Sequence, residues 1–157
     1  MNKFHLILSV LIITFVPSIT FGNVIEKLNE AGKFNKLSET LSKSGLNENL
    51  KGSGPFTVFA PLDDAFAAIS AKTYYGLLRE ENKDKLVNIL GRHVFSKKIT
   101  SSEIDGEIKL KAINGEEITI KKVNGIVYIN EAEVVTADVE VSNGVIHYIN
   151  RVLQPLK

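Results

Sequence analysis

The chain of 157 residues carries 19 Lys and Arg against 18 Asp and Glu, and 44% of its residues are hydrophobic. This composition is typical of one globular domain and excludes a disordered chain, a collagen-like repeat and a basic nucleic-acid-binding protein. The sequence has no Cys, which excludes disulfides, thiolate metal sites and a Cys nucleophile. It contains three His residues.

The first 22 residues have the order of a secretory signal. Lys3 precedes an uncharged apolar stretch, Phe4–Val16, and Pro17 ends that stretch before Gly22. A retained membrane anchor is the alternative, because Phe4–Phe21 is uncharged throughout and approaches the ~20 residues that span a bilayer. Pro17 shortens the apolar helix, so we expect cleavage after Gly22. Residues 23–157 would then form one domain without a membrane span, secreted to the periplasm, the extracellular space or the cell surface.

Helical spacing dominates the first half of the remaining chain. Apolar residues repeat with a helical period over residues 24–31 and 34–41, and Gly32 and Gly45 are expected to end these helices. Residues 46–55 are polar and rich in turn formers, which predicts a loop. A further helix is expected over residues 82–91, followed by an extended segment through Val94.

Strand signals appear at residues 56–60 and again from residue 108 onward. Apolar residues alternate over residues 108–112, 118–120 and 126–129, with the hairpin turns Asn114-Gly115 and Asn124-Gly125 between them. This pattern predicts a three-stranded meander. The last strand, Val145–Leu153, is apolar on both faces, so it should lie inside the sheet and not at its edge.

Two blocks of the chain resemble the signature blocks of the fasciclin domain. They are FTVFAPLDDAF, residues 56–66, and VSNGVIHYINRVLQP, residues 141–155, with EVVTADVEVSNG, residues 133–144, leading into the second block. The resemblance covers nearly all of residues 23–157. We therefore expect an α+β, fasciclin-like fold in which a helical first half packs against a compact β-sandwich.

Most residues of the two blocks are expected to pack and not to react. Alternate residues of a strand face opposite sides, so both block strands can be covered on both faces. Asp63 or Asp64 is expected to cap the helix that follows Pro61, since neighbouring helical carboxylates do not face each other as a catalytic dyad. The residues assigned to the core or to caps are Phe56, Val58, Phe59, Pro61, Asp63, Asp64, Phe66, Gly144, Val145, Ile146, His147, Ile149, Val152 and Leu153.

The two His residues after the signal offer the only imidazole chemistry. His147 lies in the apolar last strand, so we interpret it as a buried neutral imidazole bonded to Asp63 or Asp64, against the alternative of a base or metal ligand. His93 follows a helix end. It is either a cation near the negative helix terminus or, together with Arg92, part of a partner-binding rim.

The resemblance implies an extracellular adhesion or surface-association module. Animal adhesion members carry a Tyr-His pair linked to integrin binding, but the matching pair here is Arg92-His93, and the chain contains no Arg-Gly-Asp. The candidate partner-binding residues are Ile89, Leu90, Arg92, His93, Val94 and Phe95. No catalytic residue, metal site or cofactor is expected.

Three functions are therefore compared. The preferred one is a non-enzymatic module that binds a protein or carbohydrate on a cell surface or matrix, with clustering or weak self-association to strengthen its binding. The alternative is a carrier of an apolar small molecule or lipid in a groove between the helices and the sheet. A hydrolase ranks last, because it requires a Ser or Asp within reach of His93 or His147.

Overall fold

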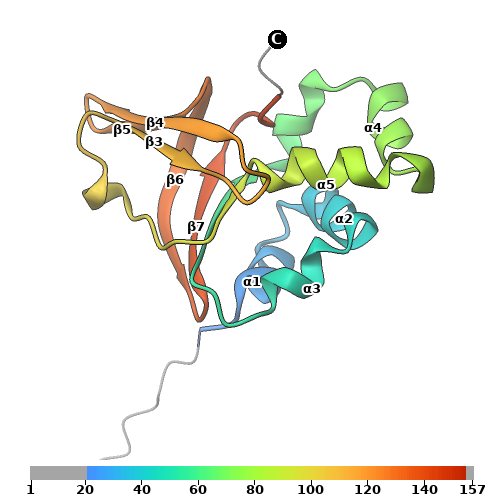
Figure 1. Ribbon diagram of the computed structural model, residues 1–157, viewed down its shortest axis with the longest axis horizontal. Helices are drawn as coiled ribbons and strands as arrows, with labels where there is room; N and C mark the ends of the chain where they lie inside the picture. Colours follow the sequence, from blue (N-terminus) through green and yellow to red (C-terminus); the bar gives the residue numbers. More distant parts are fainter. Residues whose placement is uncertain (1–20, 155–157) are drawn as a thin grey trace, which may run out of the picture.

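The structure is a computed structural model that describes residues 21–154. Helices fill the first half of the chain and strands the second half, and the helices gather on one side of the sheet (Figure 1). The helical elements are α1 (Val24–Ala31), α2 (Asn35–Ser44), α3 (Leu46–Leu50), η1 (Asp63–Ala68), α4 (Ala71–Leu77), η2 (Glu80–Asn82), α5 (Lys83–Gly91) and η3 (Ser101–Glu103). The strands are β1 (Phe56–Pro61), β2 (Val94–Phe95), β3 (Glu107–Lys111), β4 (Glu117–Val123), β5 (Ile126–Ile129), β6 (Ala132–Val141) and β7 (Gly144–Ile149).

The first two helices begin and end where local chemistry predicts. Asn23 and Glu26 form a reciprocal capping box at the start of α1, in which each side chain accepts a hydrogen bond from the other residue's backbone N–H. Gly32 and Gly45 end α1 and α2 in the left-handed conformation, with φ of 64° and 81°. The expected ends of both helices are therefore confirmed.

The seven strands form one strongly curved sheet in the order β2-β1-β7-β6-β5-β4-β3. The predicted meander is present as β3, β4 and β5, which pair antiparallel around the two Asn-Gly turns. β7 lies between β1 and β6, which confirms its interior position, and it pairs parallel to β1 from Phe56↔Gly144 to Pro61↔Ile149. The two signature blocks therefore meet side by side, and the α+β fold is confirmed.

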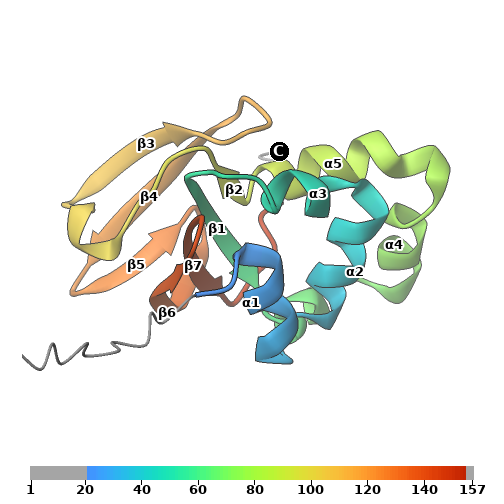
Figure 2. The same ribbon diagram turned by 90° about the horizontal axis from the view of Figure 1, so that it is seen from below.

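Alternate residues of β1 and β7 supply two separate cores. The helical core lies between the sheet and the helices and includes Val58, Ala60 and Ile146. The meander core lies inside the curved sheet, against the meander strands, and includes Phe59 and Ile149. Figure 2 shows this arrangement from below, with β1 and β7 between the helices and the meander. A strand covered on both faces explains why both blocks are apolar throughout.

Most residues that the sequence assigned to the core or to caps are buried, and four differ. Asp63 is half-buried at the start of η1. Phe56 and Val152 are half-buried and pack against the helical core from its edge. Asp64 is exposed in η1, where no side-chain bond caps the helix. The buried members are Val58, Phe59, Pro61, Phe66, Gly144, Val145, Ile146, His147, Ile149 and Leu153.

Three local expectations are wrong. Residues 46–50 form the short helix α3 instead of a loop. The last strand ends at Ile149, because the chain leaves the sheet after its bond from Leu62 N to Ile149 O. Asp63 does not cap the helix that it begins, since its carboxylate accepts a hydrogen bond from the backbone N–H of Lys36 at 2.9 Å and so caps α2.

The expected signal sequence lies almost wholly outside the described residues. Its end, Phe21 and Gly22, precedes α1, and Gly22 O accepts a hydrogen bond from Ser142 N at 3.0 Å. Among residues 21–154, no helix has the length and apolar character needed to cross a membrane. Cleavage after Gly22 stays a prediction.

Candidate functional site

His93 follows α5 and is almost completely buried, with 1% of its surface exposed. Its Nδ1 lies 2.9 Å from Ile89 O, and its Nε2 accepts a hydrogen bond from Leu153 N at 3.0 Å. A proton on Nδ1 satisfies both bonds, so the geometry selects the neutral tautomer. Burial, with a smaller contribution from the adjacent Arg92 charge, lowers the pKa of His93 to about 4. His93 is therefore not the cation at a helix end that the sequence suggested.

Arg92 is also buried, with 3% of its surface exposed, and its partner is Glu116 just before the second meander strand. Arg92 Nε and Nη2 donate to the two carboxylate oxygens of Glu116, the latter bond measuring 2.8 Å. The hydrogen bonds from Arg92 hold the pKa of Glu116 below its usual range. Among the described residues, Arg92 Nη1 has no hydrogen-bond partner. The guanidinium thus joins the end of α5 to the meander instead of facing a partner.

The predicted partner-binding stretch does not form an exposed surface. Leu90, Arg92, His93, Val94 and Phe95 are all buried, and Ile89 alone is partly exposed. The reason is that the chain after α5 runs between the two cores, where Leu90 and Val94 pack on the helical side and Phe95 on the meander side. These side chains are therefore not accessible to a partner on the surface, and the expectation that they form an exposed binding rim is corrected.

His147 is buried as expected, but its partners are different. Its Nε2 lies 2.7 Å from Ile99 O, and its Nδ1 accepts a hydrogen bond from Asp138 N at 3.1 Å. Its ring stacks on Phe59 with centroids 5.0 Å apart, and burial lowers its pKa. The expected bond to Asp63 or Asp64 is absent from the described chain. Both residues follow the end of β1, where Asp63 bonds to α2 and Asp64 is exposed, whereas His147 faces the meander core beside Phe59.

Neither imidazole has the geometry of a hydrolase base. Ser101 Oγ and Ser101 N donate to the Asp138 carboxylate, whereas His147 contacts the backbone of Asp138. Burial alone would raise the pKa of Asp138, but the two bonds from Ser101, together with the nearby His147 and Lys122, outweigh burial and lower it. A nucleophilic Ser needs a His that accepts its proton, and here Ser101 is bonded to a carboxylate instead. Within residues 21–154, no three His, Asp or Glu side chains gather as a metal site.

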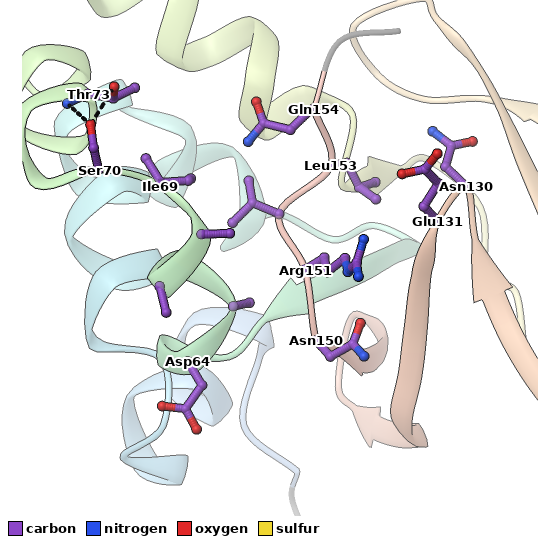
Figure 3. A pocket seen from close by; sticks show the side chains of 14 residues that line it. Asp64, Ile69, Ser70, Thr73, Asn130, Glu131, Asn150, Arg151, Leu153 and Gln154 are labelled. Carbon is purple, nitrogen blue, oxygen red and sulfur yellow. Dashed lines mark hydrogen bonds between the residues drawn. The ribbon is translucent and has the colours of Figure 1, made fainter.

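A hollow of about 1100 Å³ lies where the two signature blocks end. Figure 3 shows its three walls: η1 and the start of α4, the segment that follows β7, and the β5–β6 turn. Ala67, Ala68, Ile69, Val152 and Leu153 supply apolar surface, and polar groups come from Asp64, Ser70, Thr73, Asn130, Glu131, Asn150, Arg151 and Gln154. Amides, hydroxyls and both signs of charge thus surround small apolar side chains.

Sequence reasoning missed this hollow, although a signal for it exists. β1 and β7 run parallel, so their carboxyl ends leave the sheet at the same edge, at Pro61↔Ile149. Crevices at the carboxyl ends of neighbouring parallel strands are common ligand sites in open sheets. Residues that follow the two block strands, including Ala68 and Arg151, are therefore identifiable once those strands are expected to pair in parallel.

A second hollow, about 640 Å³, lies beside the predicted partner-binding stretch. α3, α5 and the β3–β4 turn surround it, and Gly91 and Val94 of that stretch belong to its lining. Its apolar lining residues are Leu46, Leu50, Phe56, Val87, Val94 and Ile113, while Asn49, Asp84, Asn88, Ser96 and Asn114 supply polar groups. Larger aliphatic and aromatic side chains thus line this hollow than line the first.

The fold and these surfaces define an α+β domain in which the signature residues build the core and frame a surface hollow. Residues 32–155 match the family model of the Fasciclin domain. The chain therefore belongs to the fasciclin domain family.

Relatives and a solved structure agree with this assignment. Protein sll1483 of Synechocystis sp. is 48% identical over 123 residues, which are 78% of this chain and 67% of that protein. Transforming growth factor-beta-induced protein ig-h3 of Sus scrofa is 35% identical over 134 residues, 85% of this chain but only 19% of that protein. A FAS1 domain pair from the insect cell adhesion molecule Fasciclin I has the same fold, with a TM-score of 0.76 and 21% identity over 87% of this chain and 52% of that one.

Proposed function

We propose that this protein is an exported, non-enzymatic binding module of the fasciclin class that recognises a protein or carbohydrate on a cell surface or matrix. The observation that carries the proposal is the Fasciclin domain match over residues 32–155, a fold also found in a pair of domains from an insect cell adhesion molecule. The arrangement of the two imidazoles supports a non-enzymatic role, because both ring nitrogens of each are bonded to backbone atoms.

We place partner recognition at the hollow between the block ends. Its amides and hydroxyls can exchange hydrogen bonds with sugar hydroxyls or peptide groups, and its small apolar residues leave room for a ligand to approach closely. Arg151 is exposed there and adds a donor for a carboxylate or carbonyl group. A lining that mixes amides, hydroxyls and charges with small apolar side chains suits a partner that offers hydrogen-bonding groups.

The experiment is capture of the purified chain by envelope fractions of the producing cell and by arrays of glycans and matrix proteins. Ala68→Trp fills the hollow from an exposed position, and Arg151→Glu reverses its charge. Both variants should lose capture, whereas Arg79→Glu, an exposed charge reversal outside the hollow, should keep it. Capture that Ala68→Trp and Arg151→Glu leave unchanged would contradict the placement. Mass spectrometry of the exported form tests cleavage after Gly22.

The hollow beside α5, which larger aliphatic and aromatic side chains line, favours a second candidate function, the carriage of an apolar small molecule or lipid. Its volume of about 640 Å³ is within the range of small-molecule sites, and aliphatic and aromatic side chains line it. Titration with a fluorescent fatty acid tests this candidate. Val87→Asp should abolish binding if the hollow is used, while Val123→Asp, at an exposed position outside the hollow, should not.

A further inference from the structure

The outer face of the meander carries an apolar row that the fold does not cover. The inward residues of β4, β5 and β6 are buried in the meander core, whereas alternate residues face solvent. Val123, Ile126 and Val135 are 47%, 40% and 48% exposed, and they make up half of the large exposed hydrophobic residues of the described chain. The outer face is defined here as Lys121, Val123, Ile126, Tyr128, Glu133 and Val135.

Strand register places these six residues in two rows. Val123 pairs with Ile126, and Lys121 pairs with Tyr128, which in turn pairs with Glu133. The paired register between β5 and β6 ends at Tyr128↔Glu133, and Val135 lies two residues beyond Glu133 on β6, where strand alternation puts its exposed side chain on the same face. An aliphatic row, Val123-Ile126-Val135, therefore lies next to a polar row, Lys121-Tyr128-Glu133. Contiguous exposed apolar residues with a polar rim are a mark of interaction surfaces.

The polar row has opposite charges at its two ends. Lys121 and Glu133 lie on strands that are separated by β5, about 10 Å apart at the ordinary strand spacing, and neither takes part in an ion pair among the described residues. Between them, Lys121 Nζ lies 5.8 Å from the centre of the Tyr128 ring. On its other side Lys121 has Glu107 of β3 as its cross-strand neighbour, but the two form no ion pair among the described residues, so the charges of Lys121 and Glu133 can both pair with groups outside the chain.

We propose that this outer face binds a second copy of the same chain. A two-fold axis parallel to β5 places β4 of one copy over β6 of the other, while each β5 faces its own equivalent. Lys121 then lies opposite Glu133 of the second copy, and Val123 lies opposite Val135 of the second copy. Each contact occurs twice in such an isologous dimer. The charge pattern is therefore self-complementary, and a partner with a uniform charge would leave one end of the row opposed by a like charge.

The size of the face fits a weak dimer. The face consists of six residues, far fewer than the roughly 20–30 residues on each side of a standard interface, which corresponds to transient association. Such a contact acts when many copies are displayed together, because a high local concentration multiplies weak binding. This inference is independent of the hollow and of the partner proposed for it.

Sedimentation velocity of the purified full chain tests the dimer through its charges. The wild-type chain should show a rising sedimentation coefficient at concentrations up to about 1 mM. Lys121→Glu and Glu133→Lys each create two like-charge contacts and should weaken self-association about tenfold. A one-to-one mixture of the two variants should associate again, because the mixed dimer places opposite charges at both contacts. The double variant should regain wild-type behaviour for the same reason.

Matched controls separate this arrangement from general charge effects. Lys72→Glu in α4 and Glu30→Lys in α1 make the same charge changes at exposed helical positions far from the meander, and should leave self-association unchanged. Circular dichroism checks that each variant is folded. The proposal is overturned if the wild-type chain stays monomeric, if the controls weaken association equally, or if the mixture associates no better than its components. Vesicle binding lost in Ile126→Ser, with the wild-type chain monomeric, would assign the face to a membrane instead.

Discussion

At the scale of single residues, both described imidazoles act as two-ended bridges between backbone segments. His93 joins the end of α5 to the segment after β7, and His147 joins β7 to the loop at Ile99 and to β6 at Asp138. Each ring donates one hydrogen bond and accepts another, which only the neutral form can do. These side chains therefore stabilise long-range contacts that no local pattern supplies.

Replacing His147 with Leu tests this role. Leu keeps an apolar volume in the core, but it leaves the buried Ile99 C=O without its donor and the partly buried Asp138 N–H without its acceptor. An unsatisfied buried polar group costs about 1–3 kcal/mol, so we expect a loss of about 2–4 kcal/mol in the free energy of unfolding. Urea denaturation measures this loss. Tyr148→Phe, a change at the next residue, should alter stability by much less, and equal values for the two variants would contradict the bridging role.

The Arg92–Glu116 pair predicts an asymmetric response. Glu116→Ala leaves a buried guanidinium uncompensated, whereas Arg92→Met leaves a carboxylate that is partly exposed and can be hydrated. We expect Glu116→Ala to cost about 3 kcal/mol and Arg92→Met to cost clearly less. Denaturation of the two single variants and of the double variant measures the difference. A larger loss for Arg92→Met would show that packing of the Arg92 side chain, and not its charge, is the dominant contribution.

At the scale of elements, the parallel contact between β1 and β7 begins at a glycine. A Cβ on Gly144 would collide with the backbone carbonyl of Phe56, far closer than any side chain tolerates. Beside it, Asn143 is buried and accepts a hydrogen bond from Val24 N while donating to Leu50 O and Gly52 O. Asn143-Gly144 is therefore a junction of α1, α3, β1 and β7, and not only the hairpin turn that its sequence indicates.

Gly144→Ala should separate β1 from β7. The added methyl group must displace backbone, so we expect a loss of about 3 kcal/mol or more, comparable to overpacking in a core. Gly76→Ala is the matched control, because a Cβ there meets nothing within 4 Å and Ala favours the helix α4. Thermal unfolding of the two variants should therefore change in opposite directions. Similar melting temperatures for Gly144→Ala and the wild-type chain would mean that the two strands can shift apart without cost.

The elements that the sequence predicts are those with local causes. Gly32, Gly45 and the turns at Asn114 and Asn124 act through their own backbone conformations, so the helix ends and the meander follow directly. β6 escaped prediction because two register shifts, with Asp138 at a φ of 60°, interrupt its alternation. The partners of His147 and the burial of Arg92 depend on contacts between segments that are distant in the sequence. Such contacts leave no periodic pattern of apolar residues from which they could be predicted.

At the scale of the whole molecule, the neutral imidazoles couple stability to pH. Burial lowers the pKa of His93 from its ordinary value of 6.5 to about 4, and burial lowers the pKa of His147 in the same direction. Below pH 6.5 the unfolded chain binds protons that the folded chain excludes, so stability falls as the pH falls. The contribution of His93 is present above pH 6.5 and is lost progressively down to about pH 4.

The expected result is a fall of about 2 kcal/mol in the free energy of unfolding between about pH 7 and about pH 5 from His93 alone, with a further fall from His147. This window lies above the range in which Glu116 and Asp138, whose pKa values are lowered, take up protons. Urea denaturation at several pH values measures the slope. His93→Gln, whose amide can both donate and accept without titrating, should be less stable at neutral pH but should show a flatter slope. An unchanged slope in this variant would contradict the coupling. So would an NMR titration of the His93 ring near its ordinary pKa of 6.5 in the folded chain, because a ring that is protonated freely in the native state cannot make the stability of the molecule depend on acid.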